Sequence, residues 1–148
     1  MKYAKYGTMV LMLAFLVGFS TPRAAAQEAF KGTFNLTADT YWGKTLLPPG
    51  PYKITMRLDA TERVRVVRLE GDGLRAFFLT GPPTLERISD RSTLRIENHN
   101  GVYVVRHLDA GILGQSYVFP ISKNVRMKVE HASAPSQVTV TVAAGGSY

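Results

Sequence analysis

The chain has 148 residues, of which 45% are hydrophobic and 20% are charged, a composition typical of a globular protein. It has no cysteine, which excludes disulfides, cysteine-based metal sites and thiol catalysis. The formal net charge is +7, but it falls to +4 without Lys2, Lys5 and Arg23 of the N-terminal segment, so charge alone does not indicate a nucleic-acid partner.

Residues 1–26 have the pattern of a secretory signal peptide, which we expect to be helical and to be removed on export. A positive start is followed by an apolar run at 7–19, and three alanines at 24–26 supply the small residues of a cleavage site. An uncleaved membrane anchor is the alternative, although Pro22 and the shortness of the run argue against it. Residues 27–148 then form a single domain, long enough to bury a core. We therefore predict a secreted or periplasmic protein with no membrane span after cleavage.

Alternating apolar and polar residues predict β-strands in the first half of the mature chain. One strand is expected at 30–36, a short extended piece at 44–47, and another strand at 52–58. The Pro-Pro-Gly-Pro run at 48–51 predicts a type II turn at the entry to that strand. Trp42 is the only tryptophan, and we expect it to be the large anchor of the core.

Two hairpins are predicted in the middle of the chain. Strands at 63–70 and 74–80 are joined by Asp-Gly, a signal for a two-residue type I′ loop that would place Glu70 opposite Arg75. Strands at 93–97 and 102–108 surround a polar loop. An even number of loop residues keeps the apolar side chains of both strands on one face, with Arg106 outward and His107 on the apolar face.

The last third of the chain predicts two or three more strands. One lies at 116–121, where Pro120 indicates an edge or a bulge, and the final one lies at 138–142. Between them, 125–130 alternates with a period of two but is also short enough to be a helix, and both alternatives stay open. The whole pattern is about eight short strands with frequent turns, typical of an antiparallel β-sandwich and less so of a small barrel.

Part of the sequence resembles a group of small secreted bacterial β-sandwich proteins of uncharacterised function. The resemblance rests on Trp42-Gly43, on the Leu-Pro-Pro-Gly-x-Tyr-x-Ile run at 47–54, and on Gly-Val-Tyr-Val-Val-Arg at 101–106. The strand entry is also similar, more loosely, to that of immunoglobulin-like and prealbumin-like extracellular domains. Both resemblances imply a β-sandwich, and neither brings catalytic residues, because the shared motifs are structural.

The residues that could carry chemistry do not assemble into a known motif. His99, His107 and His131 lack the spacing of a metal site, and we expect no metal and no other cofactor. Ser116 lies outside any G-x-S-x-G elbow, so a triad with His107 and Asp109 is a remote alternative. The remaining carboxylates lie in polar turns, where solvated caps explain them. We therefore expect the protein not to be an enzyme.

The sequence predicts a binding or structural role at the cell surface or in the periplasm. The first alternative is a carbohydrate or anionic-polymer binding module, with cell-surface polysaccharide or another envelope protein as the partner and no nucleic acid. The second alternative is a small outer-membrane β-barrel, although the predicted strands are short for it. In the module, an exposed Trp42 or Tyr41 would be a stacking platform. The candidate ligand surface consists of Tyr41, Trp42, Arg57, Arg65, Arg68 and Arg75.

Overall fold

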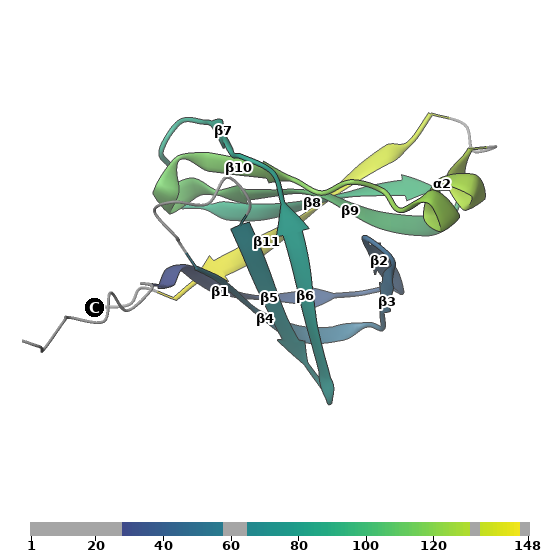
Figure 1. The fold of residues 1–148 in the computed structure, drawn as a ribbon, viewed down its shortest axis with the longest axis horizontal. Helices are drawn as coiled ribbons and strands as arrows, with labels where there is room; N and C mark the ends of the chain where they lie inside the picture. The colour runs from purple at the N-terminus through teal and green to yellow at the C-terminus, as the bar shows by residue number, and fades with distance from the viewer. Residues whose placement is uncertain (1–27, 58–64, 131–133, 146–148) are drawn as a thin grey trace, which may run out of the picture.

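The computed structural model describes residues 28–57, 65–130 and 134–145, so the predicted leader at 1–26 lies outside the described residues. Strands dominate the described chain, together with one 3-10 helix, η1 (Gly111–Leu113), and one α-helix, α2 (Lys123–Val129) (Figure 1). The strands are β1 (Glu28–Leu36), β2 (Thr40–Trp42), β3 (Thr45–Leu47), β4 (Gly50–Arg57), β5 (Arg65–Gly71), β6 (Leu74–Thr80), β7 (Thr84–Leu85), β8 (Ser92–His99), β9 (Val102–Ala110), β10 (Gln115–Val118) and β11 (Ser136–Ala144).

All the strands belong to one mixed sheet. The order is β3-β2-β9-β8-β11-β1-β4-β5-β6, and β10 joins β9 and carries β7. The layer of β8, β9 and β10 lies across the layer of β1, β4, β5 and β6, and β11 runs between the two (Figure 1). At the end of β6 the Thr80 hydroxyl donates to the carbonyl of Val118, the last residue of β10, 3.3 Å away, so the sheet is nearly barrel-shaped.

The prediction of an all-β fold is confirmed, but the expected arrangement of the strands is not. The structure has one continuous sheet in place of two separate antiparallel ones, and β2 pairs with β9 in parallel. Parallel partners need a long connection, and here about 60 residues separate Tyr41 from its partner Val104. Alternation within single strands reports which face is buried and carries no information on such distant pairing.

The hairpin of β5 and β6 has the predicted register, with Glu70 opposite Arg75. Its turn differs from the prediction, because only Gly73 has a positive φ, 65°, and a type I′ turn needs positive φ at both loop residues. The loop between β8 and β9 fits that description instead, with φ of 53° at Asn100 and 89° at Gly101. The Asn100-Gly101 loop is therefore a type I′ turn.

A β-bulge in β9 overturns the prediction for His107. Ile96 pairs with Val105, but Arg95 pairs with His107, so Arg106 is the extra residue between them. The loop between β8 and β9 has two residues, which agrees with the predicted even number. The bulge nevertheless exchanges the inward and outward positions of the β9 residues that follow it. Leu108 faces the core and His107 shares the outer face with Arg95.

The segment at 125–130, for which both a strand and a helix were predicted, lies in α2 up to Val129, and Glu130 is the C-cap of that helix. The hydroxyl of Ser122 caps the helix by accepting from the Val125 amide. Val125 and Val129, four residues apart, are both buried against Val104, whereas Met127 is 55% exposed. Valines spaced by four fit a helix as well as a strand, which is why alternation alone did not decide between them.

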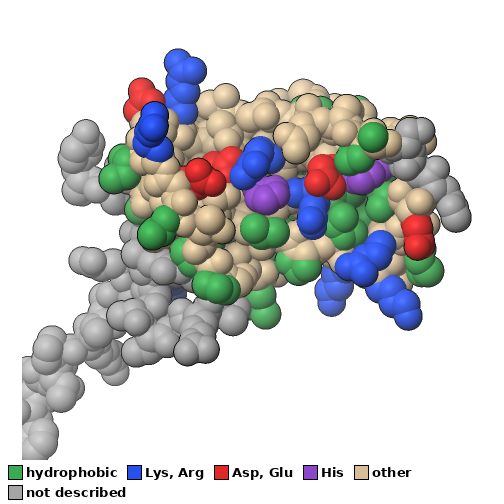
Figure 2. Space-filling model, turned by 90° about the horizontal axis from the view of Figure 1, so that it is seen from above, with side chains coloured by type: hydrophobic (Ala, Val, Ile, Leu, Met, Phe, Trp, Pro, Cys, Tyr) green, Lys and Arg blue, Asp and Glu red, His purple; other side chains and the backbone are tan. Residues whose placement is uncertain are grey.

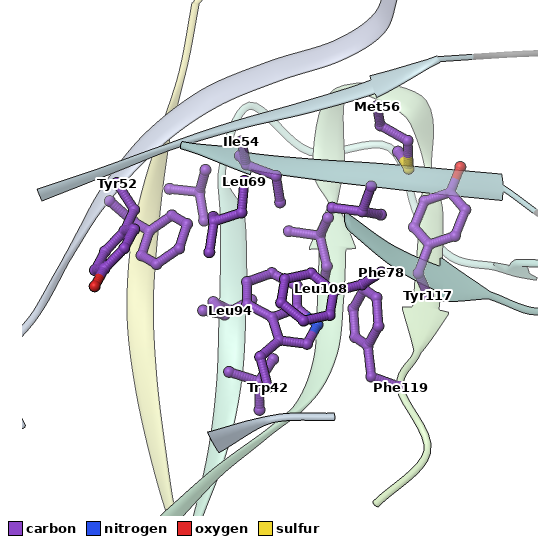
Figure 3. Close-up of a cluster of buried hydrophobic side chains, with 14 of the residues drawn as sticks. Trp42, Tyr52, Ile54, Met56, Leu69, Phe78, Leu94, Leu108, Tyr117 and Phe119 are labelled. Carbon is purple, nitrogen blue, oxygen red and sulfur yellow. The ribbon is translucent and has the colours of Figure 1, made fainter. Parts of the chain in front are cut away.

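Trp42 is the centre of the core, as predicted, and its side chain is 0% exposed. Its ring stacks on Phe78 at 4.8 Å between centroids and meets Phe119 edge-on at 4.9 Å (Figure 3). Leu94 and Leu108 lie on one side of it and Ile54 and Leu69 come from the other layer (Figure 3). The indole therefore links the two layers of the sheet.

Candidate functional site: a basic outer face

The outer surface of β1, β4, β5 and β6 carries most of the cations of these strands. Residues alternate along each strand, so one set of side chains faces the core and the other set, which includes the charged residues, faces outward. Pairing then brings the outward residues of neighbouring strands together. Thr33, Lys53, Glu70 and Arg75 form one row, and Lys31, Thr55, Arg68 and Phe77 form the next.

We call this surface the basic face and define it by five cations and one carboxylate. Among the described side chains of the four strands, Glu70 is the one carboxylate. Strands in a sheet lie about 4.8 Å apart, so the cations share a patch only four strands wide. The members of the basic face are Lys31, Lys53, Arg57, Arg68, Arg75 and Glu70.

Glu70 holds two of the arginines in place. Arg68 donates a hydrogen bond to a Glu70 carboxylate oxygen, and the Arg75 Nε lies 3.2 Å from the same oxygen. The Arg68 hydrogen bond, with the charges of Arg68, Arg75 and Lys53, lowers the pKa of Glu70 below its ordinary value. Glu70 stays ionised at neutral pH, so the basic face keeps one negative charge among five positive ones.

A shallow hollow of about 650 Å³ lies at the hairpin end of the basic face. Lys53 and Thr33 line one side, and the Glu70–Gly73 turn lines the other. Gly71 is required here, since a Cβ on it would lie 2.3 Å from the Tyr52 ring. The hollow is open to solvent, so a long ligand can lie across it without being enclosed.

The structure brings together some of the residues predicted for a ligand surface and separates others. Arg57, Arg68 and Arg75 lie on the basic face, whereas the side chain of Arg65 is not described. Trp42 is buried in the core, so it is not available as a stacking platform, and that prediction is wrong.

Tyr41 lies apart from the basic face, beside α2. Its hydroxyl accepts a hydrogen bond from the Lys128 Nζ at 2.7 Å, and the same ammonium group lies 4.9 Å from the centroid of the ring. The ring is half-buried. Tyr41 therefore packs the helix onto β2 and does not join the arginines.

Lys31 and Lys53 belong to the site but were not predicted from the sequence. Both stand on the polar side of an alternating strand, so the signal for their exposure was present. What was missing was the pairing of β1 with β4 and of β4 with β5, which places Lys53 beside Glu70. Alternation tells which face a residue occupies, and only register tells which residues share it.

A second polar cluster lies on the outer side of β8, β9 and β10, on the layer seen in Figure 2. The Ser116 hydroxyl donates to the Asp109 carboxylate at 2.5 Å, and the Arg95 guanidinium donates to the same carboxylate at 2.9 Å. Thr93 also donates to it, at 3.2 Å. Burial alone would raise the pKa of Asp109, but these hydrogen bonds outweigh burial and lower it.

The hydroxyl of Ser116 is bonded to Asp109 and not to a histidine. In the register of β9 and β10, Ser116 lies opposite Asp109, while His107 lies opposite Val118. Burial and the neighbouring Arg95 lower the pKa of His107, so its imidazole is neutral at pH 7.

The remaining histidines do not add a site. His99 lies 3.0 Å from Glu97, and His131 falls outside the described residues. Within the described part of the chain, no three side chains of the ligand types His, Asp and Glu are grouped so that they could hold a metal ion.

Comparison with protein-family models, with curated protein sequences and with solved structures gives no match to this chain. Among the residues that the structure describes, no helix has both the length and the apolar character needed to cross a bilayer. The basic face is therefore interpreted from its own geometry and charge.

Proposed function

We propose that the protein is an exported, non-catalytic β-domain, in the manner of immunoglobulin-like and prealbumin-like extracellular domains, that binds an anionic polymer through its basic face. The observation that carries the proposal is the gathering of five cations from β1, β4 and the β5–β6 hairpin on one side of the sheet. Attraction between this patch and a polyanion acts before contact and is weakened by salt. The acidic groups of cell-surface polysaccharides have the required charge.

The arrangement of the second polar cluster supports a role in binding over one in catalysis. A serine nucleophile needs a base within hydrogen-bond reach. The base within reach of the Ser116 hydroxyl is the Asp109 carboxylate, and its lowered pKa and its pairing with Arg95 make it a weak base. The Arg95–Asp109–Ser116 cluster is therefore explained by a structural role, in which it stabilises the layer of β8, β9 and β10.

A charge-neutral variant of the basic face tests the proposal. We expect Arg68→Gln/Arg75→Gln to weaken binding to dextran sulfate by about tenfold at low salt, because two exposed charge contacts are lost. Isothermal titration calorimetry at two salt concentrations measures the change. The matched control is Arg87→Gln/Arg91→Gln, which removes two exposed arginines from the loop between β7 and β8. An equal loss in both variants, or no binding by the parent protein, would refute the proposal.

Neutralising Glu70 is expected to have the opposite effect. Glu70→Gln removes the negative charge of the basic face and releases Arg68 and Arg75 from it. We expect dextran sulfate to bind about two- to fivefold more tightly at low salt. The parent protein should gain the same affinity only when the pH falls through the lowered pKa of Glu70. Titrations at pH 7 and at decreasing pH check both statements, with Glu86→Gln as the control.

A further inference from the structure

An apolar strip borders the basic face along β6, the last strand of the sheet order. Phe77 and Leu79 point outward from β6 and are 61% and 64% exposed. Val66, which pairs with Leu79 across the hairpin, is 40% exposed. We call Val66, Phe77 and Leu79 the apolar rim.

The apolar rim is unusual for a strand at the end of a sheet. Such strands are normally guarded by charged side chains, prolines or bulges, because exposed apolar edges aggregate. Residues 76–80 of β6 carry no charge and no proline, and they pair with β5 in regular register. Contiguous exposed apolar side chains of this kind mark surfaces that meet a partner.

The nearest charges to the apolar rim belong to the basic face. Arg68 is the cross-strand partner of Phe77, and Arg75 lies on the same side of β6, two residues before Phe77. Arg75 is 65% exposed, so its guanidinium and the Phe77 ring both project from this surface. The partner of this surface must therefore offer negative charge and an apolar region that lie within one or two side-chain lengths of each other.

We propose that the basic face and the apolar rim together dock the protein on the surface of an anionic lipid bilayer. This inference rests on the anion-binding role proposed for the basic face and goes beyond it, because the partner is a lipid bilayer and not a polymer. Headgroup phosphates attract the cations of the basic face near an anionic surface. Phe77 and Leu79 enter the boundary between headgroups and acyl chains, where apolar side chains are stable.

Two other occupants fit the combined surface of the basic face and the apolar rim less well. A soluble polyanion satisfies the arginines but leaves Phe77 and Leu79 in water. A second copy of the chain, packed face to face on the apolar rim, would cover it but would bring the Arg68 and Arg75 side chains of two molecules into one interface. A bilayer that contains anionic lipid satisfies both requirements.

Vesicle sedimentation tests the inference. The protein should sediment with vesicles that contain phosphatidylglycerol, and should remain in solution with vesicles of phosphatidylcholine alone. We expect Phe77→Ser/Leu79→Ser to weaken sedimentation by about tenfold or more, because two apolar side chains no longer enter the bilayer. The matched control is Leu85→Ser/Ile88→Ser, which removes two side chains that are 81% and 75% exposed elsewhere on the surface.

Dextran sulfate binding separates this inference from the proposed function. The Phe77→Ser/Leu79→Ser variant should bind dextran sulfate as the parent protein does. If the parent binds dextran sulfate but not phosphatidylglycerol vesicles, the membrane inference fails and the proposed function stands. If it binds neither, both fail. An equal loss of sedimentation in the Leu85→Ser/Ile88→Ser control would also overturn docking through the apolar rim.

A single reporter group provides a second measurement that leaves Val66 and Leu79 of the apolar rim in place. The chain has no cysteine, so Phe77→Cys creates a unique site for a polarity-sensitive fluorophore. Its emission should shift to the blue when phosphatidylglycerol vesicles are added. The same label at Leu85→Cys should remain unchanged. Absence of a shift at residue 77 would show that the apolar rim does not enter the bilayer.

Discussion

Replacing Trp42 by alanine is expected to lower the free energy of unfolding by about 3–5 kcal/mol, the usual cost of removing a large aromatic side chain from a core. The indole is fully buried between Phe78 and Phe119, and it lies where the two layers of the sheet meet. The core residues around the ring come from both layers of the sheet, and a core relaxes only partly into the cavity that a large-to-small substitution leaves. Urea denaturation followed by circular dichroism measures the loss.

Trp42→Phe is the matched variant, and its cost should be clearly smaller. The phenyl ring keeps the stacking on Phe78 and removes the indole N–H, which is buried without a hydrogen-bond partner among the described residues. Removal of that N–H offsets part of the lost contact area. If both variants unfolded at the same urea concentration as the parent protein, the role of Trp42 as the core anchor would be wrong.

Asp109→Ala is expected to give the second largest loss, about 2–4 kcal/mol, because it leaves a half-buried Arg95 without its partner. Thr93 and Ser116 lose the same acceptor. Alanine at the exposed Asp39 is the control, and it should change the urea midpoint little. A loss at Asp109 no larger than that at Asp39 would mean that the cluster does not stabilise the layer.

The same carboxylate predicts how stability depends on pH. The pKa of Asp109 is lower in the folded protein than in the unfolded chain, because the folded state binds the ionised form through Ser116 and Arg95. The stabilisation is complete above the unfolded-state pKa of about 4 and is lost as the pH falls through the lower folded value. The difference in urea midpoint between the parent protein and Asp109→Asn should therefore be constant at neutral pH and shrink in acid.

The local features of the fold were accessible from sequence because neighbouring residues determine them. Alternation located the main strands, Asp72 and Gly73 fixed the register that places Glu70 opposite Arg75, and Trp42 stood out as a core anchor. The pairing of β2 with β9 was not accessible, since it joins segments far apart along the chain. The bulge at Arg106 could not be recognised from the alternation of apolar and polar residues, and it places His107 on the outer face.

The candidate site was predicted only in part, for a related reason. Arg68 and Arg75 were recognised together because one hairpin carries both. Lys31 and Lys53 were missed because their place beside that hairpin depends on strand pairing. Trp42 was predicted as a core residue, with an exposed stacking platform as the alternative. Its local sequence fits either position, so only the fold shows that the indole is buried.

The position of β11 in the sheet determines when the fold can be completed. β11 pairs with β8 on one side and with β1 on the other, where Gly32 meets Ala144, so the hydrogen-bond ladder passes from one layer to the other through the last strand of the chain. Until residues 136–144 leave the ribosome, the two half-sheets have no common backbone ladder at this seam. The native topology therefore depends on pairings between segments far apart along the chain, and such pairings form more slowly than local contacts.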